Sequence, residues 1–191
     1  MNKPLKFFHV PKTGGSSIAH AAKEFGILWG ALDPDYIIKW KTSGSRDHQP
    51  LYQAQDENIY QKWLNDWDFF CVVRNPYEKC ISEFFFGEYR SQEASIERFN
   101  ETIQKRISEN RISNHWCPQY LFVYHDEKQI IRHVLKYENL QKEFDDLMEE
   151  YNLPIRLTYR SNVGNKKYSI SDLDSKTIRM INELHKEDFH I

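Results

Sequence analysis

Short apolar runs alternate along this chain with segments of helical spacing. Residues 5–10 (LKFFHV) and 69–74 (FFCVVR) are near-continuous apolar runs, which are typical of strands buried on both faces of a parallel sheet. Residues 130–137 form a third strand candidate. Strands that alternate with helices favour a parallel sheet. We therefore predict an α/β fold of three layers, α/β/α, around a central and mostly parallel sheet.

Six further segments have helical spacing or residues typical of helix ends. Gly26 follows residues 16–25 and suits the left-handed conformation that ends many helices. Asn75 can cap the helix after the second strand, with Pro76 at its first position, and this helix is expected to continue to about residue 89. The other helices are predicted at residues 58–64, 95–108, 140–151 and 171–186.

The composition fits one globular domain over residues 1–191. Hydrophobic residues make up 40% of the 191 positions and aromatic residues 15%, which is enough for a packed core. The formal net charge is −2, so the chain carries no overall basic signal for nucleic acid or for an anionic membrane. The 26 Lys and Arg residues still allow a local basic pocket.

The cysteines and the absence of long apolar segments indicate a cytoplasmic location. Cys71, Cys80 and Cys117 are an odd number at irregular spacing, so we expect reduced, buried thiols and neither a disulfide framework nor a zinc site. No segment approaches the roughly 20 apolar residues of a membrane span, and residues 5–10 are too short for a signal peptide.

A glycine-rich turn between the first strand and the first helix is a candidate anion site with a P-loop-like context. The first turn of a helix has unpaired N–H groups and partial positive charge, and glycines let the backbone approach an anion. A Walker A loop places its lysine after the glycines, whereas Lys12 precedes them, which argues against an ordinary ATP- or GTP-hydrolysing loop. The alternative is a plain strand-to-helix turn. The candidate contacts are Lys12, Thr13, Gly14, Gly15, Ser16 and Ser17.

A second candidate anion site begins at Arg74, where the second strand ends. Open α/β sheets bind ligands at the carboxyl ends of their strands, and a guanidinium there suits a phosphate. Ser82 lies eight residues later, about two helical turns on, and could complete the contact. The alternative is a surface arginine that pairs with a carboxylate.

Together the two motifs resemble the nucleotide-binding motifs of sulfotransferases that use 3′-phosphoadenosine-5′-phosphosulfate (PAPS). HVPKTGGSS resembles their 5′-phosphosulfate loop, and VVRNPYEKCISEF resembles their 3′-phosphate motif. These stretches are most similar to the carbohydrate, or Golgi-type, branch with the heparan sulfate 2-O- and 6-O-sulfotransferases, and to its bacterial relatives. Further similar stretches are HWCPQ at 115–119, KYENL at 136–140, NVGN at 162–165 and KEDF at 186–189.

The resemblance implies transfer of a sulfuryl group from PAPS to a hydroxyl acceptor, which in this branch is a carbohydrate. It implies that Lys12 neutralises charge on the leaving oxygen and that backbone N–H groups of residues 13–17 bind the 5′-phosphate. Arg74 and Ser82 would bind the 3′-phosphate and select PAPS over ATP. No metal is required, because a sulfuryl group carries less charge than a phosphoryl group, and the sequence contains no convincing metal cluster.

A neutral hydroxyl needs a general base, and histidine is the usual choice near neutral pH. His48 is the first candidate, since the family places its base between the two nucleotide motifs; otherwise it is an exposed loop residue. His115 is the second, as base or acceptor contact, and Trp116 could stack on a sugar or belong to the core. Glu83 follows Ser82 and is either a cleft or a surface residue, while His9 is expected to pack structurally.

Three other functions remain open from the residues. A kinase with an unusual loop would need Mg²⁺ and an acidic residue at a strand end, where Arg74 stands instead. A module that binds PAPS or its product without catalysis would not need Lys12 and a histidine base. In a structural or interaction protein, the presence of two candidate phosphate-binding motifs would be a coincidence. The residues favour the sulfotransferase.

Overall fold

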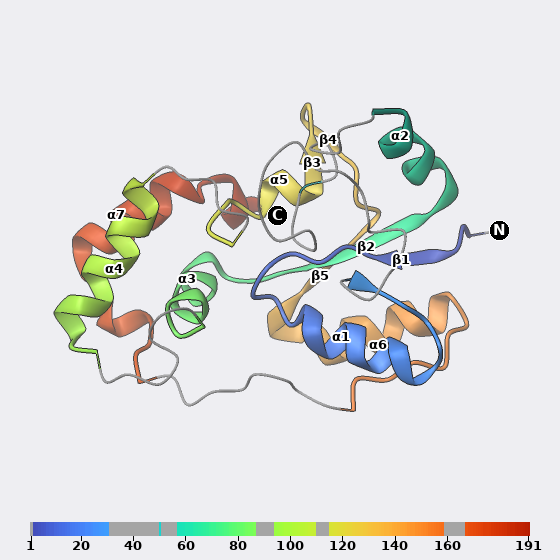
Figure 1. The fold of residues 1–191 in the computed structure, drawn as a ribbon, viewed down its shortest axis with the longest axis horizontal. Helices are drawn as coiled ribbons and strands as arrows, with labels where there is room; N and C mark the ends of the chain where they lie inside the picture. Colours follow the sequence, from blue (N-terminus) through green and yellow to red (C-terminus); the bar gives the residue numbers. More distant parts are fainter. Residues whose placement is uncertain (1, 31–49, 51–56, 87–93, 110–114, 159–166) are drawn as a thin grey trace.

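The computed structural model describes residues 2–30, 50, 57–86, 94–109, 115–158 and 167–191 (Figure 1). Its strands are β1 (Leu5–Phe7), β2 (Asp68–Val73), β3 (Tyr124–His125), β4 (Lys128–Gln129) and β5 (His133–Lys136). Its helices are α1 (Gly15–Glu24), α2 (Glu57–Asp66), α3 (Pro76–Phe84), α4 (Ile96–Ser108), α5 (Tyr120–Val123), α6 (Leu140–Glu150) and α7 (Ser175–Leu184). Short 3₁₀ turns are η5 (Tyr137–Asn139), η6 (Ile170–Asp172) and η7 (Glu187–His190).

The central sheet is parallel, with the strand order β1-β2-β5. Leu5 pairs with Asp68 at one end of the β1–β2 ladder, and Val73 pairs with Lys136 at the other end of the β2–β5 ladder. Since all three strands run in the same direction, their carboxyl ends lie at one edge of the sheet. The predicted α/β fold with a parallel sheet is confirmed.

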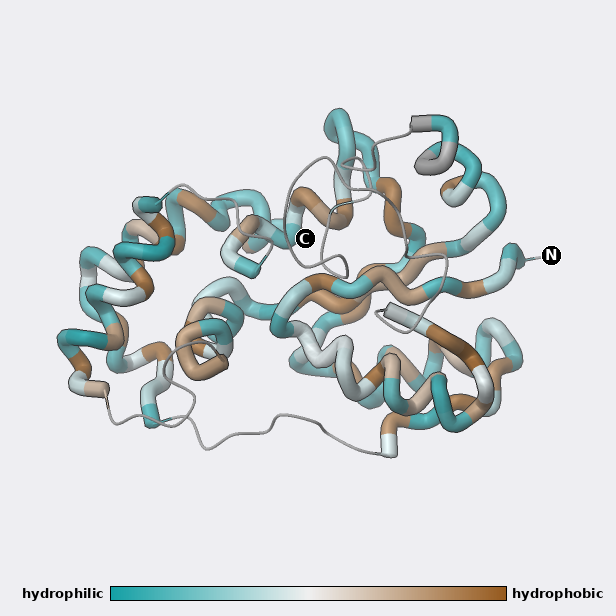
Figure 2. Tube along the Cα trace, viewed as in Figure 1, coloured by the Kyte–Doolittle hydropathy of each residue, from teal (hydrophilic) through white to brown (hydrophobic). Residues whose placement is uncertain are grey.

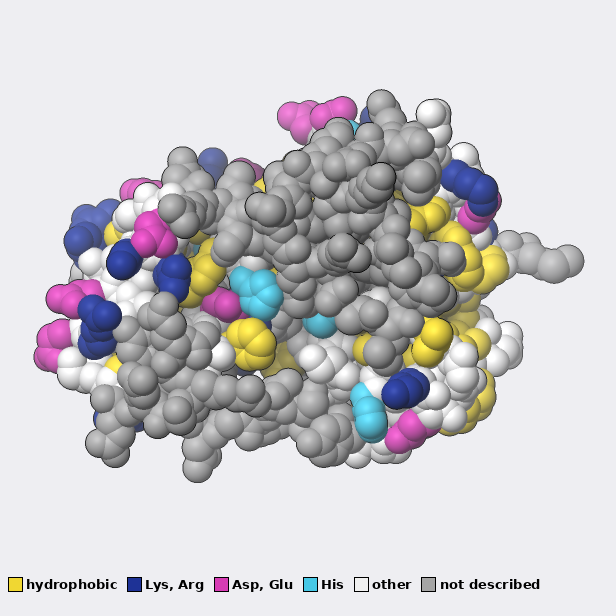
Figure 3. Space-filling model, in the orientation of Figure 1, with side chains coloured by type: hydrophobic (Ala, Val, Ile, Leu, Met, Phe, Trp, Pro, Cys, Tyr) yellow, Lys and Arg dark blue, Asp and Glu magenta, His cyan; other side chains and the backbone are white. Residues whose placement is uncertain are grey.

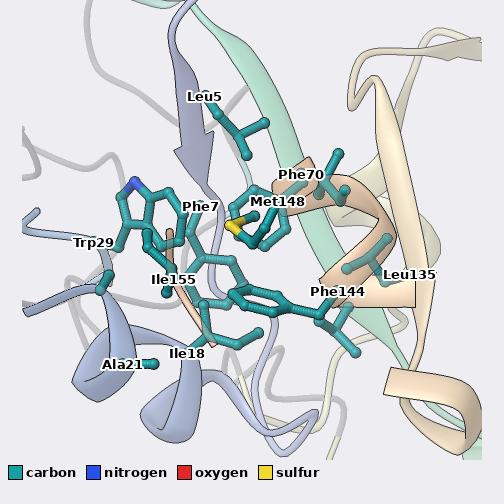
Figure 4. Packing of buried hydrophobic residues seen from close by; sticks show 13 residues of the cluster. Leu5, Phe7, Ile18, Ala21, Trp29, Phe70, Leu135, Phe144, Met148 and Ile155 are labelled. Atoms are coloured by element: carbon teal, nitrogen blue, oxygen red, sulfur yellow. The ribbon is translucent and has the colours of Figure 1, made fainter. Parts of the chain in front are cut away.

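Side chains of β2 alternate between two hydrophobic cores, as the period of a strand requires. Phe70 and Val72 face α1 and α6 and pack in a core with Phe7, Phe144 and further residues (Figure 4). On the other face, the core consists of side chains from the strands, α2, α5 and nearby turns: Phe8, Val10, Trp63, Phe69, Cys71, Val73, Cys117, Phe122, Val123 and Ile131. The hydrophobic positions follow the strands in Figure 2. Helices therefore cover both faces of the sheet.

A third core lies beyond the end of the sheet, among α3, α4 and α7 (Figure 1). Phe84 on α3 meets Phe99 on α4 edge to face, with 4.9 Å between ring centroids. Ile181 brings α7 into the same cluster. This core holds α3, which follows the tip of β2, in a fixed place.

Most element boundaries agree with the sequence, and the differences have local causes. Gly26 has φ of +73° after α1, and the side chain of Asn75 accepts hydrogen bonds from the N–H groups of Tyr77 and Glu78. The prediction that α3 continues to about residue 89 was wrong: the helix ends at Phe84, and the N–H of Phe86 donates to the carbonyl of Glu83, three residues back, in a tighter turn.

Three other predicted elements are shorter than expected. The first strand, predicted over residues 5–10, ends at Phe7, because the chain leaves the sheet before the turn that leads to α1. The third strand begins at His133, since Ile130 closes the β3–β4 hairpin through a hydrogen bond to Val123. The last helix begins at Ser175 with Asp174 as its cap, because η6 forms a separate capped turn before it. Neither α5 nor the hairpin was predicted from the sequence.

The cysteines are free and buried, as predicted. Burial raises the pKa of each thiol, to about 12 for Cys80 and Cys117. Across the described residues, none of the helices is both long enough and apolar enough to span a membrane.

Candidate functional site

The ends of the three parallel strands meet around the ring of Tyr137. A Cβ atom on Gly14, in the turn after β1, would lie 3.2 Å from the Tyr137 ring. The guanidinium carbon of Arg74, which follows β2, lies 4.2 Å from the centre of the same ring. Tyr137 itself follows β5. The two candidate anion motifs, which are far apart in the sequence, are thus joined by one aromatic side chain.

The turn after β1 places α1 with its amino end at this edge of the sheet. Gly14 has φ of +90° and caps α1, and Lys12 has φ of +65°, a region that residues with a side chain seldom occupy. The hydroxyl of Thr13 donates to the Val10 carbonyl at 2.8 Å, so it fixes the turn. Ser16 is exposed and Ser17 is buried on α1. The backbone N–H groups of the first helical turn thereby face the strand ends.

His9 packs directly on the backbone of Gly15. A Cβ atom at Gly15 would lie 2.2 Å from the His9 ring, far inside a normal contact. The ring therefore occupies the space that a side chain would need, and only glycine fits at the first position of α1. The expected structural packing of His9 is confirmed.

Gly15→Ala is expected to destabilise the fold by about 1–3 kcal/mol, as overpacking in a filled core does. Helix propensity alone would predict that Gly15→Ala stabilises the fold, because alanine is a better helix former than glycine. Urea unfolding measures the difference. His9→Ala in the same chain should recover most of the loss by removing the ring; equal instability of the single and double variants would contradict this account.

The backbone of Arg74 is held on both sides by the side chain of Gln119. The Arg74 N–H donates to Gln119 Oε1 at 2.8 Å, and Gln119 Nε2 donates to the Arg74 carbonyl at 2.7 Å. Gln119 is held in turn by Asp188, which accepts its backbone N–H at 2.9 Å. His185 lies 2.7 Å from the same carboxylate, and this contact helps to lower the pKa of Asp188 despite burial. The chain end thus braces Arg74.

The Arg74 side chain is buried, with 10% of its surface exposed, between the Tyr137 ring and Glu78. One terminal nitrogen donates to Glu78 at 2.9 Å, so the carboxylate pair that the sequence left as the alternative is observed, at a partly buried position. Within the described part of the chain, Nε is buried and has no hydrogen-bond partner. Ser82 follows Glu78 by four residues on α3 and lies on the same helix face.

A second cluster surrounds Lys12. Its ammonium lies 3.6 Å from the centre of the Phe86 ring, and the same ring stacks on His115 at 5.8 Å between centroids. Nδ1 of His115 lies 3.0 Å from Glu83. Figure 3 shows histidine, acidic and hydrophobic surface side by side near the middle of this face. Lys12 and His115 therefore share one aromatic neighbour.

His9 lies beside this cluster. Burial lowers the pKa of His9 to about 4, and the nearby charges of His115 and Lys12 act in the same direction. The imidazole of His9 is therefore neutral at physiological pH, and it adds no positive charge to the site.

We expect the free energy of unfolding to fall as the pH drops from 7 towards 4. The unfolded chain takes up a proton on His9 near pH 6.5, whereas the folded chain resists until about pH 4. The contribution of His9 is of the order of 3 kcal/mol. His9→Gln should remove most of this pH dependence in urea titrations at pH 7 and 4.5, while the contribution of buried His185, whose pKa is also lowered by burial, remains. If the free energy of unfolding of His9→Gln changed with pH as steeply as that of the wild type, the prediction would be wrong.

The structure brings most of the sequence candidates to this edge of the sheet. Lys12, the glycine turn and Arg74 lie there, Ser82 lies further along α3, and His48 lies outside the described residues. Trp116 is half-buried and packs against the third core. Tyr137 and Gln119 were not predicted as site residues. The stretches KYENL and HWCPQ were the available signals for these two.

Residues 2–191 match a family model described as the sulfotransferase family. No match to the chain was found among curated proteins or among solved structures. The family match covers nearly the whole chain, including both anion motifs and the residues that brace them. This protein belongs to the sulfotransferase family.

Proposed function

We propose that this sulfotransferase uses PAPS as donor and a hydroxyl, on a carbohydrate, as acceptor. The observation that carries the proposal is the convergence on Tyr137: the glycine turn, through Gly14, and the guanidinium of Arg74 both lie against this one ring. A donor with phosphates at both the 5′ and 3′ positions needs two anion sites at a fixed separation, and the two motifs around Tyr137 support this proposal as candidates for them.

Features of the chain fit such a donor. The buried Nε of Arg74 is a donor for which the described residues offer no acceptor, and it is therefore available to a ligand oxygen. Ser82 lies on the same face of α3 and would complete the contact with a 3′-phosphate. At the other motif, Gly14 has φ of +90° and begins α1, whose first-turn N–H groups suit an anion.

PAPS would supply the sulfuryl group, whose bond to the bridging nucleotide oxygen breaks as the acceptor oxygen bonds to sulfur. Lys12 would stabilise the negative charge that develops on the leaving oxygen. The backbone N–H groups of residues 13–17, with the hydroxyls of Ser16 and Ser17, would hold the 5′-phosphate. A histidine would take the acceptor proton, and His48 stays the first candidate from the sequence.

A carbohydrate acceptor is supported by the surface beside Lys12. Phe86 is 43% exposed, and Trp116 is half-buried next to His115. Aromatic side chains with an exposed face suit the apolar faces of sugars, while His115 offers a polar contact for a hydroxyl.

Calorimetric titration with adenosine 3′,5′-bisphosphate (PAP), AMP and ATP, all without metal, tests the donor. Tight binding of PAP and weak binding of AMP are expected. Labelled PAPS with desulfated heparan and chondroitin chains then tests transfer. Equal or absent binding of PAP and AMP would overturn the proposal, and binding only of ATP with Mg²⁺ would point to a kinase. PAP binding without any transfer would leave only a binding module.

A further inference from the structure

Glu83 and His115 form a partly buried carboxylate–imidazole pair 32 residues apart in the sequence. Nδ1 of His115 lies 3.0 and 3.1 Å from the two Glu83 oxygens, and the Glu83 side chain is 8% exposed. An ionised carboxylate can only accept hydrogen bonds, so Nδ1 of the imidazole must donate. In the neutral ring the lone pair then belongs to Nε2, which is the form required of a base.

The backbone around His115 is fixed by the same helix that carries Glu83. Lys79, one turn earlier on α3 and 1% exposed, donates to the carbonyls of His115 at 2.7 Å and Cys117 at 3.2 Å. Burying a lysine is costly unless its charge is well compensated. α3 thus orders both the main chain and the ring of His115. Such double support is typical of side chains held for chemistry.

The pair lies where the proposed reaction needs a base. An in-line displacement places the attacking and leaving oxygens on opposite sides of sulfur, so the base and the leaving-group lysine must be close without touching. Phe86 meets this condition, because its ring contacts both Lys12 and His115. The His115 side chain is 23% exposed, which leaves a surface that a substrate can reach.

The other histidines in the described part of the chain have different environments. His9 packs against Gly15, and His185 is fully buried against Asp188. His133 contacts Tyr151 in a network with Asp68, at the amino ends of the strands. The remaining ones are His20, His125 and His190, of which His20 pairs with Glu24 on the exposed surface of α1.

We infer that His115 is the general base of the transfer and that Glu83 is its positioning residue, an inference that rests on the proposed function. Nε2 takes the proton of the acceptor hydroxyl as the oxygen–sulfur bond forms. The bond from sulfur to the bridging oxygen breaks, and its electron pair stays on that oxygen, beside Lys12. Glu83 stabilises the resulting imidazolium, which later releases the proton to water.

His115→Asn should lower the rate of sulfuryl transfer from PAPS about 100- to 10,000-fold, as loss of a general base does. The acceptors are desulfated heparan and chondroitin, and release of PAP in water alone serves as a second readout. PAP affinity should change less than threefold. His20→Asn, on the exposed pair with Glu24, is the matched control and should leave both rates unchanged.

The variant Glu83→Gln tests whether Glu83 positions the His115 ring or only fills space beside it. It keeps the size of the side chain but removes the charge that stabilises imidazolium, so the acid limb of the rate profile should move to lower pH. ¹⁵N spectra of His115 should show the Nδ1–H tautomer in the wild type and a mixture in Glu83→Gln. Glu24→Gln is the control. An unchanged pH profile and tautomer would overturn the role of Glu83.

His48→Asn tests the competing base. Loss of transfer in His48→Asn together with full activity in His115→Asn would overturn the inference while leaving the donor site intact. Failure of the wild type to bind PAP would instead overturn the proposed function. The two failures are therefore distinguishable in the same set of proteins.

Discussion

Lys12→Ala is expected to reduce the rate of sulfuryl transfer about 100- to 1,000-fold, because it removes the donor at the position where negative charge develops. The ammonium lies 3.6 Å from the centre of the Phe86 ring, beside the glycine turn and α1. Transfer from labelled PAPS to desulfated heparan or chondroitin measures the effect. PAP binding should weaken much less than the rate.

Lys23→Ala is the matched control. Lys23 is exposed in the last turn of α1, and its removal changes the net charge of the protein by the same amount. It should transfer at the wild-type rate. A Lys12→Ala variant with undiminished transfer would show that the leaving oxygen is stabilised by another group.

Arg74→Ala should weaken PAP binding about 10- to 100-fold, the usual range for losing hydrogen bonds to a charged group. AMP binding should stay nearly unchanged, because AMP lacks the 3′-phosphate. The preference for PAP over AMP, measured as the ratio of their affinities by calorimetry without metal, should therefore fall by the same factor. The buried Nε of Arg74, unpaired within the described residues, is the structural reason to expect this.

Arg74→Lys keeps the charge but loses the planar fork, so an intermediate preference for PAP is expected. Arg179→Ala, on the exposed surface of α7, controls for the loss of one positive charge. If Arg74→Ala kept the wild-type preference for PAP over AMP, Arg74 would belong to the Glu78 pair alone, and the 3′-phosphate site would lie elsewhere.

The local parts of the protein can be predicted from short stretches of residues. The turn at residues 9–17 and the capped start of α3 depend on neighbours within a few positions, so glycine, proline and asparagine predict them directly. The near-continuous apolar run before Arg74 likewise predicted a strand of a parallel sheet. Local residue patterns were therefore enough to place both anion motifs at strand ends.

Which distant residues meet at those strand ends depends on long-range packing. Tyr137 joins Gly14 to Arg74, and Gln119 braces Arg74, through contacts that no short-range pattern encodes. Glu83 faces His115 because Lys79 and the third core hold α3 against the chain near residue 115. His48 lies outside the described residues and stays a prediction from sequence. Periodicity reports which face of an element is buried, whereas the choice among the chain's eight histidines depends on how loops pack across the sheet edge.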